Sequence, residues 1–208
     1  MECNMTFQER LEYGKANKIA MELIHIATDD YKGSRCCIIN GILGSGFVLA
    51  EQAVEKYLKC FLILIYPKID VKKFNRHKLS VLIEKINEIG DYGLNKFIPF
   101  ANRLSDLYEL IRYPDNNLIG TINSYGMGGN EIDEIDEFVF HLMEILPIPD
   151  EIKFRGAFYG TLFNERGEEN TLWSHWLICN NKQFEIRKNE LRTKFIQVFN
   201  HIYPHIPI

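Results

Sequence analysis

Apolar residues recur every three or four positions through the first 146 residues, a period that predicts amphipathic helices. We expect a first helix to carry the apolar stripe and to end near the polar sequence DDYKGS at 29–34; the stripe consists of Phe7, Leu11, Ile19, Leu23 and Ala27. The same period continues from about 36 to 66 and predicts a long second helix that Pro67 ends. In that helix Glu51, Gln52, Glu55, Lys56 and Lys59 fall together on a polar face. We expect this face to be solvated or to form a dimer seam, and it could also line one cleft with Arg112.

Three shorter helices are predicted next, at about 78–89, at 94–111 and from 131 onwards. Asn130 is a favourable N-cap residue for the last of them, with Asp133 at the capping-box position and further acids in the first turns. Residues 113–130 carry no periodic pattern. A stretch of that length is long for a plain connection and is typical of a functional or mobile segment.

The pattern changes after Pro147 and Pro149. Two aromatic-rich segments, FRGAFYGTLFN and TLWSHWLIC, flank the turn-like ERGEEN and predict a β-hairpin, with a third short strand possible at 184–186 and a last helix after it. The aromatic residues could form the core of the hairpin or, with nearby basic residues, stack on single-stranded nucleic acid. The predicted fold is therefore mainly α: a five-helix up-and-down bundle over 1–148, and a C-terminal β-hairpin plus helix (α+β) over 149–208.

Composition and charge narrow the class of protein. A formal charge of −4 gives no global sign of nucleic-acid binding, although it leaves room for a local basic patch. The sequence MECNMTFQER lacks a signal-peptide core, and charges interrupt the most apolar region, 36–67, before it reaches the length of a membrane span. Five cysteines without a C-x-x-C pair indicate reduced thiols. We expect a cytoplasmic protein with no metal site and no cofactor.

The small residues of GILGSG, at 41–46, resemble a phosphate-binding loop only superficially, because the Gly-Lys-Ser/Thr that should follow is missing. They lie inside a helical pattern, so we interpret them as allowing close helix packing.

Three motifs occur in order along the predicted helices: AEQAVEKYLKCFLI at 50–63, HKLSVLIEKI beginning at His77, and RYPD at 112–115. Together they resemble the HEPN family of small helical-bundle proteins. The resemblance covers roughly residues 36–115 and does not extend to the C-terminal segment. It implies a helical bundle, which in the endoribonuclease members of the family dimerises to form a cleft.

The resemblance implies one of two activities. Many family members are metal-independent endoribonucleases, often toxins or defence effectors, in which an arginine is followed after four to six residues by a histidine. Others lack this pair and resemble binding modules, several of them encoded beside minimal nucleotidyltransferases. In the present sequence no arginine has a histidine in that window, and the window after Arg112 begins with Asn117. Asparagine cannot exchange a proton near neutral pH as imidazole does.

We therefore expect a homodimeric binding or interaction module, which contacts RNA, a nucleotide or a nucleotidyltransferase partner in a prokaryotic defence or toxin–antitoxin context. The expected binding residues are Arg112, Tyr113, Asp115, Asn116, Glu55 and Lys56. A divergent endoribonuclease, with Arg112, Asn117 and His77 as candidate catalytic residues, is the first alternative, and an oligomeric scaffold without a ligand is the second.

Arg112 itself admits two interpretations. A cation in the last turn of a helix is stabilised by the helix dipole, and Asp115 could be its ion-pair partner. A guanidinium is also suited to bidentate contacts with phosphate. The sequence leaves both interpretations open.

Overall fold

The computed structural model describes residues 7–69, 78–113, 130–154, 156, 158–163, 167–169 and 171–202. Every regular element within these residues is helical. In chain order they are α1 (Phe7–Ile39), α2 (Leu43–Ile65), α3 (Leu79–Asn87), η2 (Leu94–Phe97), α4 (Ile98–Arg112), α5 (Glu131–Ile145), α6 (Asp150–Lys153), η3 (Tyr159–Thr161), α7 (Thr171–Ile178) and α8 (Lys182–Ile202).

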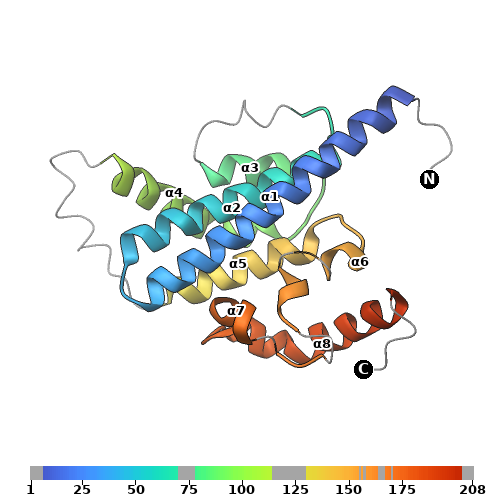
Figure 1. Ribbon diagram of the computed structural model, residues 1–208. Coiled ribbons are helices and arrows are strands. Elements are labelled where there is room, and N and C mark those ends of the chain that lie inside the picture. The colour runs from blue at the N-terminus through green and yellow to red at the C-terminus, as the bar shows by residue number, and fades with distance from the viewer. Residues whose placement is uncertain are drawn as a thin grey trace.

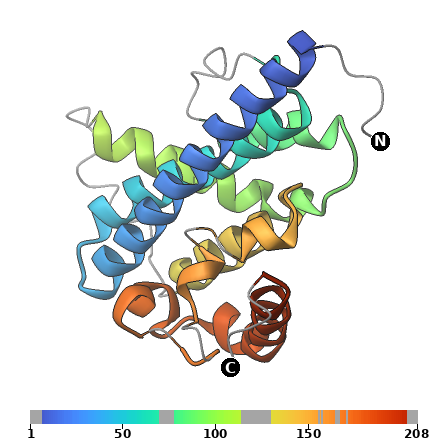
Figure 2. The same cartoon turned by 45° about the vertical axis from the view of Figure 1, so that its right-hand side comes forward.

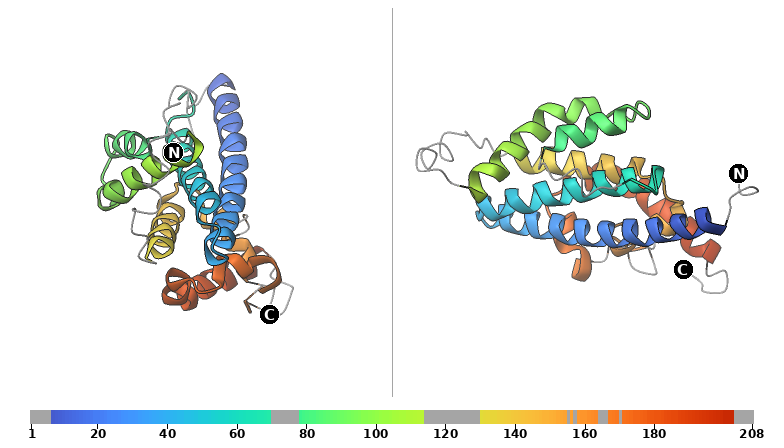
Figure 3. Two further views of the ribbon diagram at one scale, coloured as in Figure 1. Left: turned by 90° about the vertical axis from the view of Figure 1, so that its left-hand side faces the viewer. Right: turned by 90° about the horizontal axis from the view of Figure 1, so that it is seen from above.

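Helix α2 is the centre of the bundle. It runs antiparallel to α1 along most of its length, and it also packs against α3, α4 and α5 (Figures 1 and 3). Its core positions, such as Ala50, Val54 and Leu58, are fully buried. The predicted helical bundle is confirmed. Within the described residues, no helix is both long enough and apolar enough to cross a membrane.

The turn between α1 and α2 lies later than predicted. Helix α1 continues through the polar sequence at 29–34, and the chain turns at 40–42, where Gly41 has a φ of +78°. The polar residues do not end the helix because Tyr31 and Ser34 are buried against the rest of the protein, while Asp29 lies at the surface within 3.6 Å of Lys32 Nζ. The expected helix end near residue 34 was therefore wrong.

The predicted role of the small residues after this turn is confirmed at Gly46. A Cβ added there would lie 2.5 Å from Cγ1 of Ile38 and 3.2 Å from the carbonyl oxygen of Ser34. Only glycine lets the start of α2 approach the end of α1 this closely.

Helix α5 begins at the predicted residue, but not through the predicted cap. Asn130 has helical backbone angles and its side chain makes no capping hydrogen bond, so the predicted capping box was wrong. The acids of the first turn instead form ion pairs with other helices, Glu134 with Arg103 of α4 and Asp133 with Lys182 of α8.

The predicted β-hairpin is absent from the described residues. The segment contains η3 and α7, and residues 184–186 belong to α8. Its described residues form only an isolated antiparallel bridge, between Phe163 and Glu169 of the predicted turn. Phe154, Phe158, Tyr159 and Phe163 of this segment are core residues, whereas Trp176 is half-buried. Phe158 packs 5.2 Å from Phe140 of α5, measured between ring centroids. Aromatic residues favour strands only where a sheet buries them, and here helices provide that burial.

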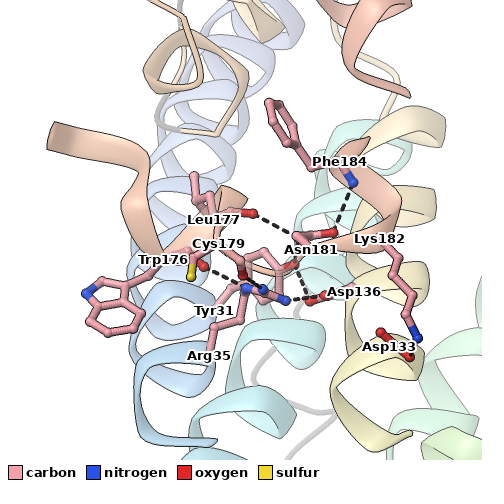
Figure 4. Close-up of polar contacts among 10 residues, drawn as sticks. All are labelled: Tyr31, Arg35, Asp133, Asp136, Trp176, Leu177, Cys179, Asn181, Lys182 and Phe184. Atoms are coloured by element: carbon pink, nitrogen blue, oxygen red, sulfur yellow. Dashed lines mark hydrogen bonds and ion pairs between the residues drawn. The ribbon is translucent and has the colours of Figure 1, made fainter. Parts of the chain in front are cut away.

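The C-terminal helices α7 and α8 pack beneath the bundle on α1 and α5 (Figure 2). A buried polar cluster joins them. The Arg35 guanidinium pairs with the carboxylate of Asp136 and donates hydrogen bonds to the carbonyl oxygens of Trp176 and Cys179 at the end of α7 (Figure 4).

Tyr31 and Asn181 complete this cluster. The Tyr31 hydroxyl donates to Asp136 at 2.6 Å and accepts a hydrogen bond from the Asn181 amide at 3.1 Å. The other end of the Asn181 side chain accepts from the backbone N–H of Phe184, so Asn181 also caps the first turn of α8. The cluster therefore fixes both the end of α7 and the start of α8 to the bundle.

Candidate functional site

Arg112 lies at the surface, at the C-terminal end of helix α4. The helix begins with Pro99 in its first turn, where a proline costs no hydrogen bond, and its inward residues Ala101, Leu104 and Tyr108 are fully buried. Arg112 follows one turn after Tyr108 as the last residue of the helix and is exposed. The helix ends one residue after the predicted end at 111, and the first four residues of the predicted helix form the separate 3-10 helix η2.

The Arg112 guanidinium is held against two tyrosines. Its Nη1 donates a hydrogen bond to the Tyr108 hydroxyl at 2.5 Å. Its Cζ lies 5.3 Å from the ring centroid of Tyr108 and 5.7 Å from that of Tyr113. Cations at these distances are attracted by the negative face of an aromatic ring. Tyr108 is completely buried, whereas Tyr113 is 57% exposed, so the arginine lies between a fixed support and an accessible ring.

The contacts of Arg112 keep it cationic and directed outwards. The hydrogen bond with Tyr108 raises the pKa of the guanidinium above its ordinary value. Among the described residues no carboxylate forms an ion pair with Arg112. Its remaining N–H groups are consequently available to an anion from solution.

The polar face predicted on α2 is only partly solvated: its two acids are buried, contrary to expectation, whereas Gln52, Lys56 and Lys59 are half-buried. Glu51 is completely buried and Glu55 is 8% exposed. Lys59 Nζ lies 2.6 Å from the Glu55 carboxylate, and Lys56 Nζ donates to Asp30 of α1 at the same distance. The face is covered because α1 and α4 pack on either side of it, and most of its charges are neutralised by neighbours.

Glu51 is the exception on this face. Neither of its carboxylate oxygens has a hydrogen-bond partner among the described residues. Burial, followed by repulsion from Glu55, raises the pKa of Glu51 to about 8. At neutral pH the side chain is therefore mostly a neutral carboxylic acid.

The structure brings only part of the predicted site together. Arg112 and Tyr113 are adjacent and both exposed. Glu55 and Lys56 are engaged with Lys59 and Asp30, and no described contact joins them to Arg112. Their role in binding stays a prediction. His77, Asp115, Asn116 and Asn117 lie outside the described residues, so their predicted roles stay open as well.

Two residues of this region had escaped prediction. Tyr108 supports Arg112 through its hydroxyl, and the spacing of four residues within one helix was the available signal. Glu51 lies four residues after Phe47 and three before Val54, both buried, which marks a position on the apolar stripe rather than on the polar face.

Comparisons with known proteins give one finding. A scan against models of protein families matches the HEPN domain over residues 20–146, which is more than half of the chain. Searches of curated proteins and of solved structures returned no match. The matched residues run from α1 to the end of α5 and include the three motifs that resemble the family in sequence. The chain belongs to the HEPN domain family.

Proposed function

We propose that this protein is a binding module that contacts RNA or a nucleotide through Arg112. The observation that supports the proposal is the exposed guanidinium, held by Tyr108 and flanked by the exposed ring of Tyr113. A guanidinium makes bidentate contacts with phosphate, and an exposed aromatic ring can stack on a base. Arg112 can therefore bind the phosphate of a nucleotide, and Tyr113 can stack on its base.

A helix-capping role alone does not account for this arrangement. The helix dipole would favour any cation at the end of α4, lysine included. A buried tyrosine hydroxyl that accepts from one guanidinium nitrogen, beneath a second ring, orients the planar group specifically. Orientation of this kind lowers the entropic cost of binding an anion.

Membership of the HEPN domain family adds a context to this proposal. We propose that the protein acts as a homodimer beside a nucleotidyltransferase partner, in a prokaryotic defence or toxin–antitoxin system. The oligomeric state can be measured by light scattering on the purified protein. The partner can be sought by co-expression with a neighbouring nucleotidyltransferase.

Fluorescence anisotropy with a labelled single-stranded RNA tests the proposal. Arg112→Ala should raise the Kd by about tenfold or more, because a phosphate contact is lost. The affinity of the wild type should fall with rising salt, as expected for binding through phosphate groups. Arg103→Ala is the matched control, since Arg103 is an exposed arginine of the same helix whose guanidinium is paired with Glu134 at 2.6 Å. It should leave the Kd nearly unchanged.

Two results would overturn the proposal. Equal affinity of the wild type and the Arg112→Ala variant would show that binding does not use this site. Cleavage of the RNA by the wild type, abolished in a folded Arg112→Ala variant, would instead establish the alternative of a divergent endoribonuclease. Growth arrest on expression, relieved by the same substitution, would support that alternative.

A further inference from the structure

A small pocket lies between the bundle and the C-terminal helices, away from Arg112. Its volume is about 190 Å³, and its lining comes from α5, α6, η3 and α8. Figure 1 places α6 at the end of the bundle opposite to the C-terminal end of α4, where Arg112 lies. The pocket is therefore separate from the site of the proposed function.

Two ion pairs account for four of the charged groups in its lining. Arg187 donates to the Glu144 carboxylate at 3.1 Å, and Lys194 Nζ lies 2.7 Å from the Glu190 carboxylate. Each pair joins opposite charges and is neutral as a whole. The charged lining residues outside these two pairs are Lys153 and Asp150.

Lys153 is the buried cation of the pocket. Its side chain is only 9% exposed, and its Nζ donates one hydrogen bond, at 2.8 Å, to the backbone carbonyl oxygen of Glu144. No carboxylate among the described residues forms an ion pair with it. Burial lowers the pKa of Lys153, as expected for an ammonium group without a countercharge in contact. Two of its three N–H donors remain for a ligand.

Tyr159 presents a second unused polar group. Its side chain is 4% exposed and lines the pocket, and its hydroxyl forms no hydrogen bond with any described residue. The Tyr159 ring stacks on Phe154, with centroids 5.0 Å apart, so the hydroxyl is fixed in position. The Tyr159 hydroxyl is not enclosed by protein, so it can donate a hydrogen bond to a molecule in the pocket.

Asp150 supplies the opposite charge at the rim. It lines the same pocket one helical turn before Lys153, is exposed, and forms no ion pair with the described residues. After the two ion pairs are set aside, the pocket has one buried cation, one hydroxyl donor and one exposed carboxylate. A complementary ligand has an anionic group at its inner end and a cationic group at its outer end.

We propose that this pocket binds a free amino acid, with the ligand carboxylate on Lys153 and Tyr159 and the ligand ammonium facing Asp150. Because the two ion pairs are neutral, Lys153 and Asp150 leave the lining without net charge, which suits a zwitterion better than a dianion such as a phosphate ester. An amine without an acid group would leave the buried cation unpaired. The volume suits a ligand smaller than the drug-sized molecules that typical pockets enclose.

Calorimetric titration of the full chain with each of the twenty amino acids tests the proposal. At least one should bind saturably, whereas acetate and methylammonium, which carry the two charges separately, should bind far more weakly. Lys153→Met should raise the Kd by at least about tenfold, because a charge-assisted hydrogen bond is lost. Tyr159→Phe and Asp150→Asn should each weaken binding by several fold.

Lys182→Met is the matched control. Lys182 is an exposed lysine of α8 paired with Asp133 outside the pocket, so its loss should leave the Kd unchanged. Circular dichroism establishes that each variant is folded, and Tyr159→Phe preserves the shape of the pocket if Lys153→Met does not fold. The absence of saturable binding by every amino acid, or undiminished binding by both Lys153→Met and Tyr159→Phe, would overturn the proposal.

Discussion

Arg35 of α1 and Asp136 of α5 form an ion pair in which both side chains are completely buried. The two residues are 101 positions apart in the chain. The same guanidinium donates to the carbonyl oxygens of Trp176 and Cys179, where the negative end of the α7 dipole lies. Arg35 therefore connects the HEPN bundle to the C-terminal helices.

Replacing Arg35 with alanine should destabilise the protein by about 3–5 kcal/mol, because the Asp136 carboxylate and two helix-end carbonyls would be left buried without a donor. Urea unfolding followed by circular dichroism measures this change. Lys96→Ala removes one partner of an exposed pair with Glu137, whose side chains are 55% and 43% accessible, and should cost less than about 1 kcal/mol. Equal destabilisation by the two substitutions would contradict the role given to Arg35.

The role of Arg35 also shows what the sequence could and could not predict. Helices α2 to α5 follow from local periodicity, because each buries one apolar face. Arg35 lies within the polar part of α1, and its partners are more than a hundred residues away, so no local pattern marks it as buried. The continuation of α1 past residue 34 depends on the same long-range contacts.

The prediction of a β-hairpin in the C-terminal segment was wrong for a related reason. Short aromatic-rich runs are compatible with a strand or with a buried helix, and only the neighbouring surface decides between them. The Phe163 ring contacts the rings of Phe184 and Phe195 within a core formed by helices. In the candidate site, Arg112 was predictable from its motif, whereas the support from Tyr108 required the geometry.

Replacing Glu51 with glutamine should stabilise the protein at alkaline pH. Burial raises the pKa of Glu51 from 4.5 to about 8, so the folded state holds a proton that the unfolded state releases above pH 4.5. The free energy of unfolding of the wild type therefore falls between pH 4.5 and 8, by at most about 1.4 kcal/mol per pH unit from this group. Glutamine has the same shape and does not ionise, so this loss should disappear.

Urea unfolding of both proteins at about pH 5, 7 and 8.5 measures the difference between their free energies of unfolding across the titration of Glu51. The two free energies should be similar at the lowest pH and should diverge as the pH rises. Glu84→Gln, at an exposed position on α3, should follow the wild type throughout. Parallel curves for the wild type and the Glu51→Gln variant would show that Glu51 ionises freely in the folded protein.

Replacing Gly46 with alanine should destabilise the protein by about 1–3 kcal/mol, the usual cost of overpacking. The added methyl group would lie 2.5 Å from Ile38 Cγ1, so α1 and α2 would have to move apart where they meet. Gly14→Ala is the opposite case, because a Cβ at this helical position meets no atom within 4 Å. It should stabilise α1 by about 0.5–1 kcal/mol. Thermal unfolding measures both, and equal signs for the two variants would contradict the close contact at Gly46.

Replacing Tyr108 with phenylalanine should weaken RNA binding while the fold is retained. The ring beneath Arg112 remains, but the guanidinium loses the hydroxyl that accepts its hydrogen bond at 2.5 Å. A net contribution of about 0.5–1.5 kcal/mol corresponds to a Kd that rises about two- to tenfold, less than for Arg112→Ala. Tyr57→Phe removes an equally buried hydroxyl, bonded to Thr28 in the core, and should lower stability without changing the Kd. If both variants bind RNA equally well, Tyr108 supports the core alone and does not orient Arg112.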